Sequence, residues 1–412
     1  MAVTQTLSEP SQPATPPALT LLVSLSPLAP ESLAATLANL AAAFPDQSIL
    51  VATPDPDPPA LPVAPNFRLA TYTPAALVTA AWVLTAADYL NTFKLMQEHQ
   101  SPACLLLGAE AQSLAPEALR ALAGGVLNRR CDLTTAHYSL GPRDGLVNSA
   151  ILYPVTRALF ATRSRYPLAI DLAFSARMAE RLAACAQRHT AAGQPSALVW
   201  PVSEATAAGF SITEAPAGPR ALPPPDFADL NSLLAQVAGS FFADLDAKAS
   251  FWQRARIAYP PRPTPPHPAS RQTTPTDGPE PPDIQPMLDS FHLAYTNLQE
   301  IWSLVLPPNS LLGLKKLSLQ PAAAFRMPDT LWARIIYDFV LAYRLRTLNR
   351  GHLLGALTPL YLAWVASHLL LTSGAGPETV APEQHIEALA AAFETDKAYL
   401  VSRWRWPDRF NP

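Results

Sequence analysis

Residues 19–53, LTLLVSLSPLAPESLAATLANLAAAFPDQSILVAT, decide which class of fold to expect. Two continuous apolar runs, LTLLVSLS and SILVAT, flank the segment ESLAATLANLAAAF, which begins after Pro30 and ends before Pro45. Runs that are apolar on both faces are typical of strands covered by helices on either side, and the middle segment has a helical pattern. This strand–helix–strand order predicts a parallel sheet with a right-handed crossover.

The same alternation extends over the first half of the chain. The patterns that follow predict strands at 67–72, 103–107, 197–202 and 210–215, and helices at 75–98, 116–127, 150–161, 175–188 and 203–208. Strands that alternate with helices in this way are typical of α/β domains. We therefore expect residues 1–18 to be a disordered lead-in and residues 19–222 to form an α/β domain.

The second half of the chain has the pattern of an all-α domain. Residues 216–225, PAGPRALPPP, are dense in proline and mark the expected boundary. Beyond them, apolar residues recur at helical spacing, beginning with Leu230, Leu233 and Leu234. Helices are expected within 226–258 and at 287–306, 328–349, 352–372 and 382–402. Residues 223–412 are thus expected to form a helical domain, interrupted by a mobile proline-rich insertion at 259–286.

Composition bears on the compartment and on the class of partner. The 412 residues carry a formal net charge of -3, which gives no electrostatic argument for binding nucleic acid. The three cysteines, Cys104, Cys131 and Cys185, lack metal-site spacing and indicate a reduced, cytoplasmic protein. The first residues have neither the basic nor the apolar region of a signal peptide, so we expect none there.

One apolar segment raises the question of a membrane. Residues 352–371, HLLGALTPLYLAWVASHLLL, are nearly long enough to span a bilayer. The segment contains His352, Pro359, Ser367 and His368, and no basic cluster flanks it on one side. These features favour a buried helix over a transmembrane one, and peripheral membrane contact is left open.

A carboxylate follows the buried run at 103–107. In ACLLLGAEAQSLAPEAL, Glu110 comes where an α/β enzyme would place metal-binding carboxylates, at the carboxyl end of a strand. Gly108 and Ala109 beside it carry no ligand. Glu110 is therefore the candidate metal ligand, and the alternative is a solvated loop carboxylate.

A polar island follows at 138–149, YSLGPRDGLVNS. Arg143 could bind a phosphate or carboxylate in bidentate fashion, whereas Asp144-Gly145 is also a plain turn signal. Asn148 is expected at a helix N-terminus, where it could cap the helix or help to bind an anion. Tyr138 opens the island and is a candidate substrate-binding residue with Arg143, Gly145 and Asn148.

Asp171 is an isolated carboxylate between Ile170 and Leu172. It is a candidate catalytic residue, and the alternative is an N-cap for a helix that begins near Leu172. His137 and His352 are expected to be structural. The chain lacks a nucleophile elbow, a Walker A loop, the metalloprotease helix motif and the dinucleotide-binding glycine fingerprint, which argues against hydrolases, P-loop NTPases and classical dehydrogenases.

Four stretches together resemble a known family. They are RDGLVNSAILYPVTRALF (143–160), SEATAAGFSITEAPAG (203–218), DLNSLLAQVAGSFF (229–242) and LWARIIYDFVLAYRLRTLNRGHLLGALTPLYLAWVAS (331–367). In order and type they are similar to bacterial family 2-type glycosyltransferases of the mannosylglycerate synthase and glucosyl-3-phosphoglycerate synthase kind. The resemblance implies a GT-A nucleotide-sugar-binding domain followed by a helical C-terminal domain.

The resemblance also implies a reaction and a set of site residues. It implies retaining transfer of a sugar from a nucleotide diphosphate to a small or lipid-like acceptor, usually with Mg²⁺ or Mn²⁺. The family's acidic pair falls on Gly108 and Glu110. Its acceptor-pocket segment falls on residues 166–171, where Asp171 is kept and Ala169 and Ile170 replace two glycines. Asp171 and Asp144 are thus expected to be catalytic. The alternative is a catalytically impaired GT-A-fold protein that binds a nucleotide or a partner, and a membrane-associated scaffold is a weaker third reading.

Overall fold

The protein is described by a computed structural model that covers residues 19–55, 67–74, 82–220, 229–255, 283–373 and 379–406. Within these residues the first half forms a seven-stranded sheet in the order β3-β2-β1-β4-β6-β5-β7. The strands are β1 (Leu21–Leu25), β2 (Ile49–Thr53), β3 (Phe67–Thr71), β4 (Ala103–Leu107), β5 (Leu133–Ser139), β6 (Asp171–Ser175) and β7 (Ile212–Pro219). β6 runs antiparallel to β4 and β5, and the other neighbouring strands are parallel.

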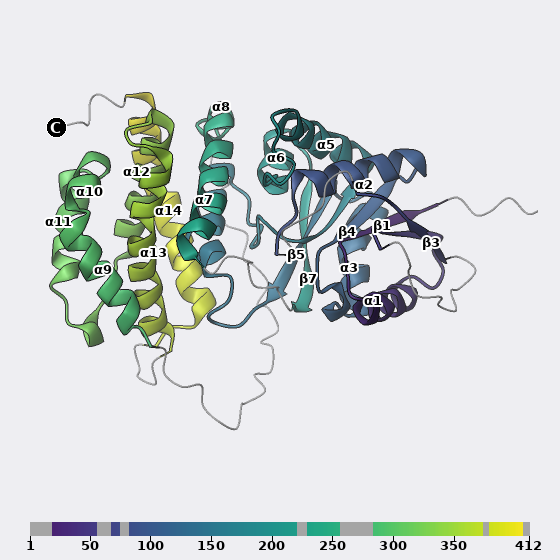
Figure 1. The fold of residues 1–412 in the computed structure, drawn as a ribbon, viewed down its shortest axis with the longest axis horizontal. Helices are drawn as coiled ribbons and strands as arrows, with labels where there is room; N and C mark the ends of the chain where they lie inside the picture. The colour runs from purple at the N-terminus through teal and green to yellow at the C-terminus, as the bar shows by residue number, and fades with distance from the viewer. Residues whose placement is uncertain are drawn as a thin grey trace, which may run out of the picture.

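Helices cover both faces of this sheet (Figure 1). α1 (Pro30–Ala43) and α3 (Pro116–Leu127) pack together on one face, and α2 (Ala86–Glu98) and α5 (Ala176–Ala191) pack together on the other. α6 (Pro201–Ala207) contacts α5. Because both faces are covered, β1, β2 and β4 are buried along their whole length, which explains their continuous apolar sequences.

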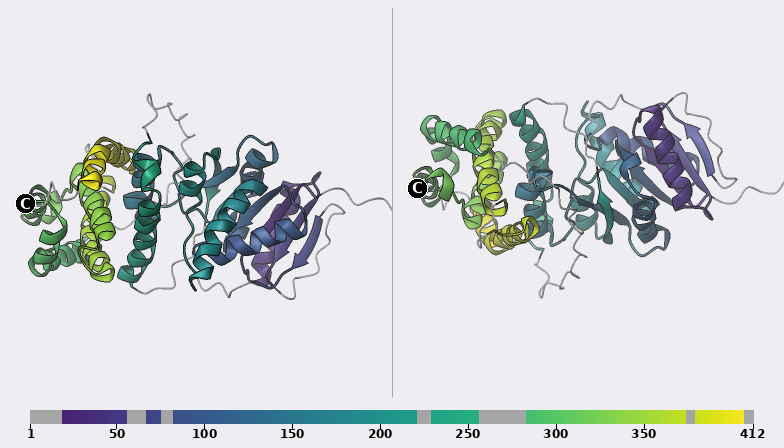
Figure 2. Two further views of the ribbon diagram at one scale, coloured as in Figure 1. Left: turned by 90° about the horizontal axis from the view of Figure 1, so that it is seen from above. Right: turned by 90° about the horizontal axis from the view of Figure 1, so that it is seen from below.

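The second half is a group of helices beside the sheet domain (Figures 1 and 2). They are α7 (Leu230–Ala247), α8 (Ala249–Trp252), α9 (Gln285–Asn297), α10 (Gln299–Val305), α11 (Pro308–Ser318), α12 (Asp329–Leu345), α13 (Arg350–Thr372) and α14 (Pro382–Arg405). An α/β sheet domain followed by a helical C-terminal region is the architecture predicted from the sequence, so the fold class is confirmed at this level.

One segment of the first half packs with the helices of the second. A π-helical turn at Asn148–Leu152 leads into α4 (Tyr153–Phe160), and α4 packs against α14. Its apolar side chains share one core with those of α7, α12 and α13. A separate core lies in the sheet domain. The polar island at 138–149 therefore leads directly into the junction between the two halves.

Two of the predicted elements are wrong in detail. Residues 197–202 form no strand: Leu198 makes an isolated bridge with Thr85, and α6 begins at Pro201. The helix predicted from residue 75 begins at Ala86 instead, because Thr85 and Asp88 form a capping box there. The start of that prediction, residues 75–81, lies outside the described residues.

The predicted boundary is also corrected in part. Residues 216–219 belong to β7 and not to a linker, and residues 221–228 lie outside the described part of the chain. The lead-in at 1–18 and most of the insertion at 259–286 lie outside it too, although α9 already begins at Gln285. The domain limits stay predictions.

α13 is the segment that raised the membrane question. Among the described residues, this one helix is long and apolar enough to cross a membrane by length and composition. In the structure 83% of its most apolar 18-residue window is buried. It packs against α7, α9 and α12, in the position expected of a buried core helix.

A buried pair of histidines joins α13 to α14. The Nδ1 atoms of His368 and His385 are 2.7 Å apart, and Nε2 of His385 lies 3.0 Å from Oδ1 of Asp329. Both rings stack against Trp364. Nε2 of His368 has no hydrogen-bond partner among the described residues. Burial, together with the neighbouring His385, lowers the pKa of His368 from 6.5 to about 4.

We expect acid to destabilise the protein through His368. Its pKa is lower in the folded state than in the unfolded state, so the unfolded chain binds the proton first. The resulting stability is present above about pH 6.5 and is lost as the pH falls towards 4, by up to about 3 kcal/mol. Urea unfolding at pH 7 and at pH 4 measures the loss of unfolding free energy in acid, which should be smaller in the His368→Gln variant than in the unchanged protein. The exposed His352 of the same helix, changed to Gln, is the control. An unchanged acid loss in the His368 variant would contradict the assignment.

Candidate functional site

The sheet order places one edge of the domain where ligands bind in open α/β sheets. From β1 the chain adds β2 and then β3 on one side of the sheet, and it then returns to add β4 on the other side of β1. The strand order reverses there, so the topological switch point lies between β1 and β4. In such sheets ligands bind outside the carboxyl ends of the strands at this point. Gly108, which follows β4, and Asp171, which begins β6 beside it, both lie at that edge.

A buried ion pair occupies this edge next to β4. Nε of Arg220, just after β7, donates to Oδ2 of Asp171 at 2.8 Å, and Nη2 lies 3.2 Å from Oδ1. Both side chains are 0% exposed. A bidentate, fully desolvated pair of this kind fixes the two groups relative to each other.

Tyr138 and the β4 end complete the environment of Asp171. The Tyr138 hydroxyl donates to Oδ2 of Asp171 at 3.0 Å and accepts from the amides of Ile170 and Asp171 at 3.2 Å each. The amide of Gly108 donates to Oδ1 of Asp171 at 3.2 Å. Burial, and then the charge of Asp171, raise the pKa of Tyr138 well above 10, so the phenol stays protonated and can donate.

Arg220 also holds the loop that follows β4. Its Nη2 donates to the carbonyl of Ala109 at 2.6 Å, and its Nη1 donates to the carbonyl of Glu110 and to Oγ of Ser113. A guanidinium has five N–H donors, and these contacts together with Asp171 engage all three of its nitrogens. Sequence reasoning missed Arg220 because it lies in the proline-rich stretch assigned to the domain boundary.

The packing around Gly108 leaves no room for a side chain. A Cβ atom built on Gly108 would lie 2.9 Å from Cβ of Ile170, closer than real Cβ contacts. Ile170 is one of the two residues that stand where the resembled family has glycine. Positions 108 and 170 are therefore in direct contact, and Ile170 occupies the space that a side chain at position 108 would need.

Among the described residues, this edge offers few protein ligands for a divalent cation. Mg²⁺ and Mn²⁺ require several oxygen ligands, and carboxylates are the usual protein donors. The half-buried Glu110 accepts from Nε2 of Gln112 at 2.6 Å, while Asp171 is paired with Arg220. Within the described part of the chain, no group of three or more His, Cys, Asp or Glu side chains could hold a metal ion. Metal binding at Glu110 stays a prediction.

Residues 141–145 of the polar island form a solvent-exposed turn. Arg143 and Asp144 are exposed, and Oδ2 of Asp144 accepts from the amide of Gly141 at 3.2 Å. Gly145 has a φ of 63°, which glycine adopts readily. The structure therefore places Arg143, Asp144 and Gly145 on a surface turn, whereas the other predicted catalytic residue, Asp171, is buried.

Two capping expectations are corrected. Asn148 does not cap a helix: it lies in the π-helical turn, and its side-chain amide donates to the carbonyl of Arg165 at 2.9 Å. Asp171 begins β6 and does not cap a helix either, since α5 begins at Ala176 and is capped by Ser175.

Arginines from the first half bind acidic residues on α14. Arg157 is bonded to Glu387 at 2.5 Å and to Glu394 at 2.9 Å, and Arg165 is bonded to Glu383 at 3.0 Å. These contacts join the segment after the polar island to the helical region.

Further contacts connect this junction between the two halves to the sheet. The amide of Arg165 donates to Oε1 of Glu214 at 2.6 Å, and Oε2 of Glu214 lies 2.9 Å from Nδ1 of His137. The ring of His137 in turn contacts that of Tyr166 edge to face. His137 therefore has partners within the structure, and β5, β7 and α14 are connected through these contacts.

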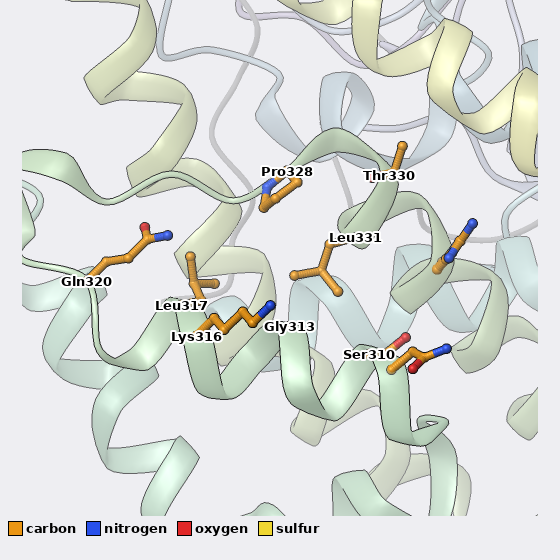
Figure 3. Close-up of a pocket in the computed structure, with 10 residues that line it drawn as sticks. Ser310, Gly313, Lys316, Leu317, Gln320, Pro328, Thr330 and Leu331 are labelled. Carbon is orange, nitrogen blue, oxygen red and sulfur yellow. The ribbon is translucent and has the colours of Figure 1, made fainter.

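A small cavity opens elsewhere, between α11 and α12 (Figure 3). Its volume is about 310 Å³. Gly313 allows close packing there, because a Cβ at this position would lie 2.9 Å from Cδ1 of Leu331. Arg334 lines the cavity but is bonded to Asp396 at 3.1 Å. We regard this cavity as a packing crevice between two helices.

Comparison with known proteins gives structural similarity but no sequence match. No protein-family model matches the chain, and no curated protein matches it. Among solved structures, it is similar to glucosyl-3-phosphoglycerate synthase from Mycobacterium tuberculosis in complex with Mn²⁺, uridine diphosphate and glucosyl-3-phosphoglycerate. The identity is 14%, the TM-score is 0.35, and the match covers 59% of this chain and 87% of that one.

A second similar structure is mannosyl-3-phosphoglycerate synthase from Rubrobacter xylanophilus. The identity is 13%, the TM-score is 0.38, and the match covers 59% of this chain and 79% of that one. These are enzymes of the kind that the sequence resembles. At such low sequence identity the similarity concerns the fold alone. TM-scores this low do not support transferring residue roles from these enzymes to this chain.

Proposed function

We propose that this chain is a glycosyltransferase of GT-A type that binds a nucleotide-diphosphate sugar without a divalent cation. The observation that carries the proposal is the Asp171–Arg220 pair beside the switch point between β1 and β4. Ligands of open α/β sheets bind at such a switch point. Among the described residues, the Arg220 guanidinium supplies the cationic group at this edge, in the place of a metal ion held by carboxylates.

The chemistry of the donor makes a cationic group relevant. A departing nucleoside diphosphate carries negative charge, which an enzyme stabilises with a metal ion or with Arg and Lys. Arg220 is the buried cation at this edge, and Asp171, Tyr138 and the Ala109 and Glu110 carbonyls hold it in place. Arg220 must release some of these partners in order to contact a diphosphate.

The finer parts of the proposal rest on the sequence resemblance. We include transfer with retention and a small or lipid-like acceptor on that basis. A cytoplasmic location is supported by the three cysteines, all of which are buried free thiols. Asp144 and Arg143 lie on an exposed turn, where they are accessible to an acceptor.

One observation favours a second candidate, a binding module without transferase activity. The Asp171 carboxylate accepts from Arg220, Tyr138 and Gly108 and is 0% exposed, so it does not face an acceptor in this state. A protein that keeps the fold but closes its centre in this way would bind a ligand or partner without turnover.

We expect binding of UDP- or GDP-sugars to be insensitive to metal. Isothermal titration in excess Mn²⁺ and in EDTA should give dissociation constants within about threefold of each other. The loss of a contact that contributes to binding would weaken the affinity by about tenfold. Release of nucleoside diphosphate in the presence of acceptors then separates transfer from binding alone. Glu110→Gln is the matched control and should leave both titrations unchanged.

Each outcome of this experiment has one meaning. Binding at least tenfold weaker in EDTA, with the same loss in Glu110→Gln, shows that a cation bound at Glu110 is needed. Binding without turnover selects the second candidate. The absence of any response to nucleotide sugars removes the transferase and any nucleotide-binding module, and leaves a module that binds another kind of partner.

A further inference from the structure

A second, larger cavity lies where the two halves of the protein meet. It has a volume of about 730 Å³ and is bounded by α5 and α6 of the sheet domain and by α7 and α8 of the helical region, which face one another in Figure 1. This volume is within the range of small-molecule sites. The cavity shares no lining residue with the Asp171–Arg220 centre.

Two carboxylates in the wall are already neutralised. Glu204, whose side chain is 4% exposed, lies 3.0 Å from Nζ of Lys248 and 3.0 Å from Nε of Arg181. Asp244 is bonded to the same Lys248, and it accepts from Oγ of Ser203 at 2.6 Å. The buried part of the wall is therefore a satisfied polar cluster and not an open acidic surface.

The remaining charges in the wall are positive. Arg188 is 64% exposed and lies 3.9 Å from Glu204, which Lys248 and Arg181 already pair. Arg350 is exposed, and its guanidinium lies 4.1 Å from the ring centre of Tyr343. Four basic side chains thus line the cavity against two carboxylates, which leaves an excess of positive charge.

The position of Arg350 is not explained by helix stability. It is the first residue of α13, where the positive end of the helix dipole disfavours a cation. The neighbouring amides of Gly351 and His352 are capped by Asn349, so Arg350 serves no capping role. Arg188, in contrast, lies in the last turn of α5, where a cation is favourable. At Arg350 the guanidinium and the helix terminus both add positive potential to the cavity wall.

We propose that this cavity binds a small anionic molecule that carries a phosphate group, held by Arg188 and Arg350. Guanidinium groups match phosphate oxygens in bidentate fashion, and the partly buried Phe251 offers an apolar wall for the rest of the ligand. The ligand would bridge α5 of the sheet domain and α13 of the helical region. The inference does not depend on the proposed transferase activity.

Inorganic phosphate and pyrophosphate are the probes for this site. Isothermal titration of the full chain should detect binding of at least one of them at constant ionic strength, set with chloride. The double variant Arg188→Gln/Arg350→Gln should bind at least about tenfold more weakly, the loss expected for a lost charged contact. Arg120→Gln, a surface arginine on α3 outside the cavity, is the matched control and should bind as the unchanged protein does.

Two results would overturn the inference. One is no binding of either anion beyond the response to chloride, and the other is equal affinity in the double variant and the unchanged protein. Equal melting temperatures of the two proteins in chloride show that the variant is folded. A sugar phosphate that binds more tightly than free phosphate identifies an organic ligand, and equal affinities identify the phosphate group alone as the ligand. Either of these last results supports the site.

Discussion

Arg220→Met is expected to destabilise the protein by about 3–5 kcal/mol, the cost of removing one partner from a buried ion pair. Asp171 is 0% exposed, so its carboxylate would remain in the interior, where Tyr138 and the Gly108 amide are its remaining donors among the described residues. The variant also loses the hydrogen bonds from Arg220 to the loop after β4. Urea unfolding at pH 7 measures the change.

A second substitution distinguishes the ion pair from simple packing. Asp171→Asn combined with Arg220→Met removes both charges and should recover at least about 2 kcal/mol of the loss, because no unpaired charge stays buried. Arg120→Met, which breaks an exposed pair with Glu117, should cost less than about 1 kcal/mol. If the double variant is less stable than Arg220→Met, the pair is not what stabilises this edge.

Arg220→Lys should not restore what Arg220→Met removes. The guanidinium reaches Asp171, the Ala109 and Glu110 carbonyls and Ser113 from three nitrogens in a fixed plane. An ammonium group is a compact point charge with three donors and cannot reach acceptors arranged in this way. The chain therefore depends on the shape of the arginine as well as on its charge.

The sequence predicted the sheet more accurately than the site. Buried strands such as 103–107 show as continuous apolar runs, and β4 has those bounds in the structure. Residues 197–202 are equally apolar but form no strand: Trp200 lies against Phe241 of α7, with ring centres 4.7 Å apart, and Val199 and Val202 belong to the core of the sheet domain. Apolar runs alone do not distinguish a buried strand from a buried segment of this kind.

The site could not be predicted because its partners are distant in the chain. Asp171 was identified as an isolated carboxylate, but its partner Arg220 lies 49 residues further on, inside a proline-rich stretch. A single arginine among prolines carries no periodic signal. The packing of Ile170 against Gly108 is likewise a contact between the residue before β6 and the residue after β4, which no local pattern reveals. Pairing of this kind becomes visible only when the order of the strands is known.

The second large effect concerns Trp332, which connects the helical region to the segment after the polar island. Its side chain is 0% exposed, and its indole Nε1 donates to the carbonyl of Ala150 at 2.8 Å. Its ring stacks on that of Trp364, with ring centres 6.2 Å apart. Trp332→Ala is therefore expected to cost about 3–5 kcal/mol, since it opens a cavity in the core shared by α4, α12 and α13 and leaves the Ala150 carbonyl without this donor.

Trp406→Ala is the matched control, because that side chain is 62% exposed and should cost less than about 1 kcal/mol. Thermal unfolding followed by tryptophan fluorescence and by circular dichroism measures both variants.

Because the core around Trp332 includes Ile151 and Leu152 from the segment that joins β5 to β6, the loss of stability should reach the sheet domain as well as the helices. A Trp332 variant whose helices melt earlier while the sheet domain keeps its original melting temperature would show that the two halves are stable independently. Coincident loss of both signals would show that they fold as one unit.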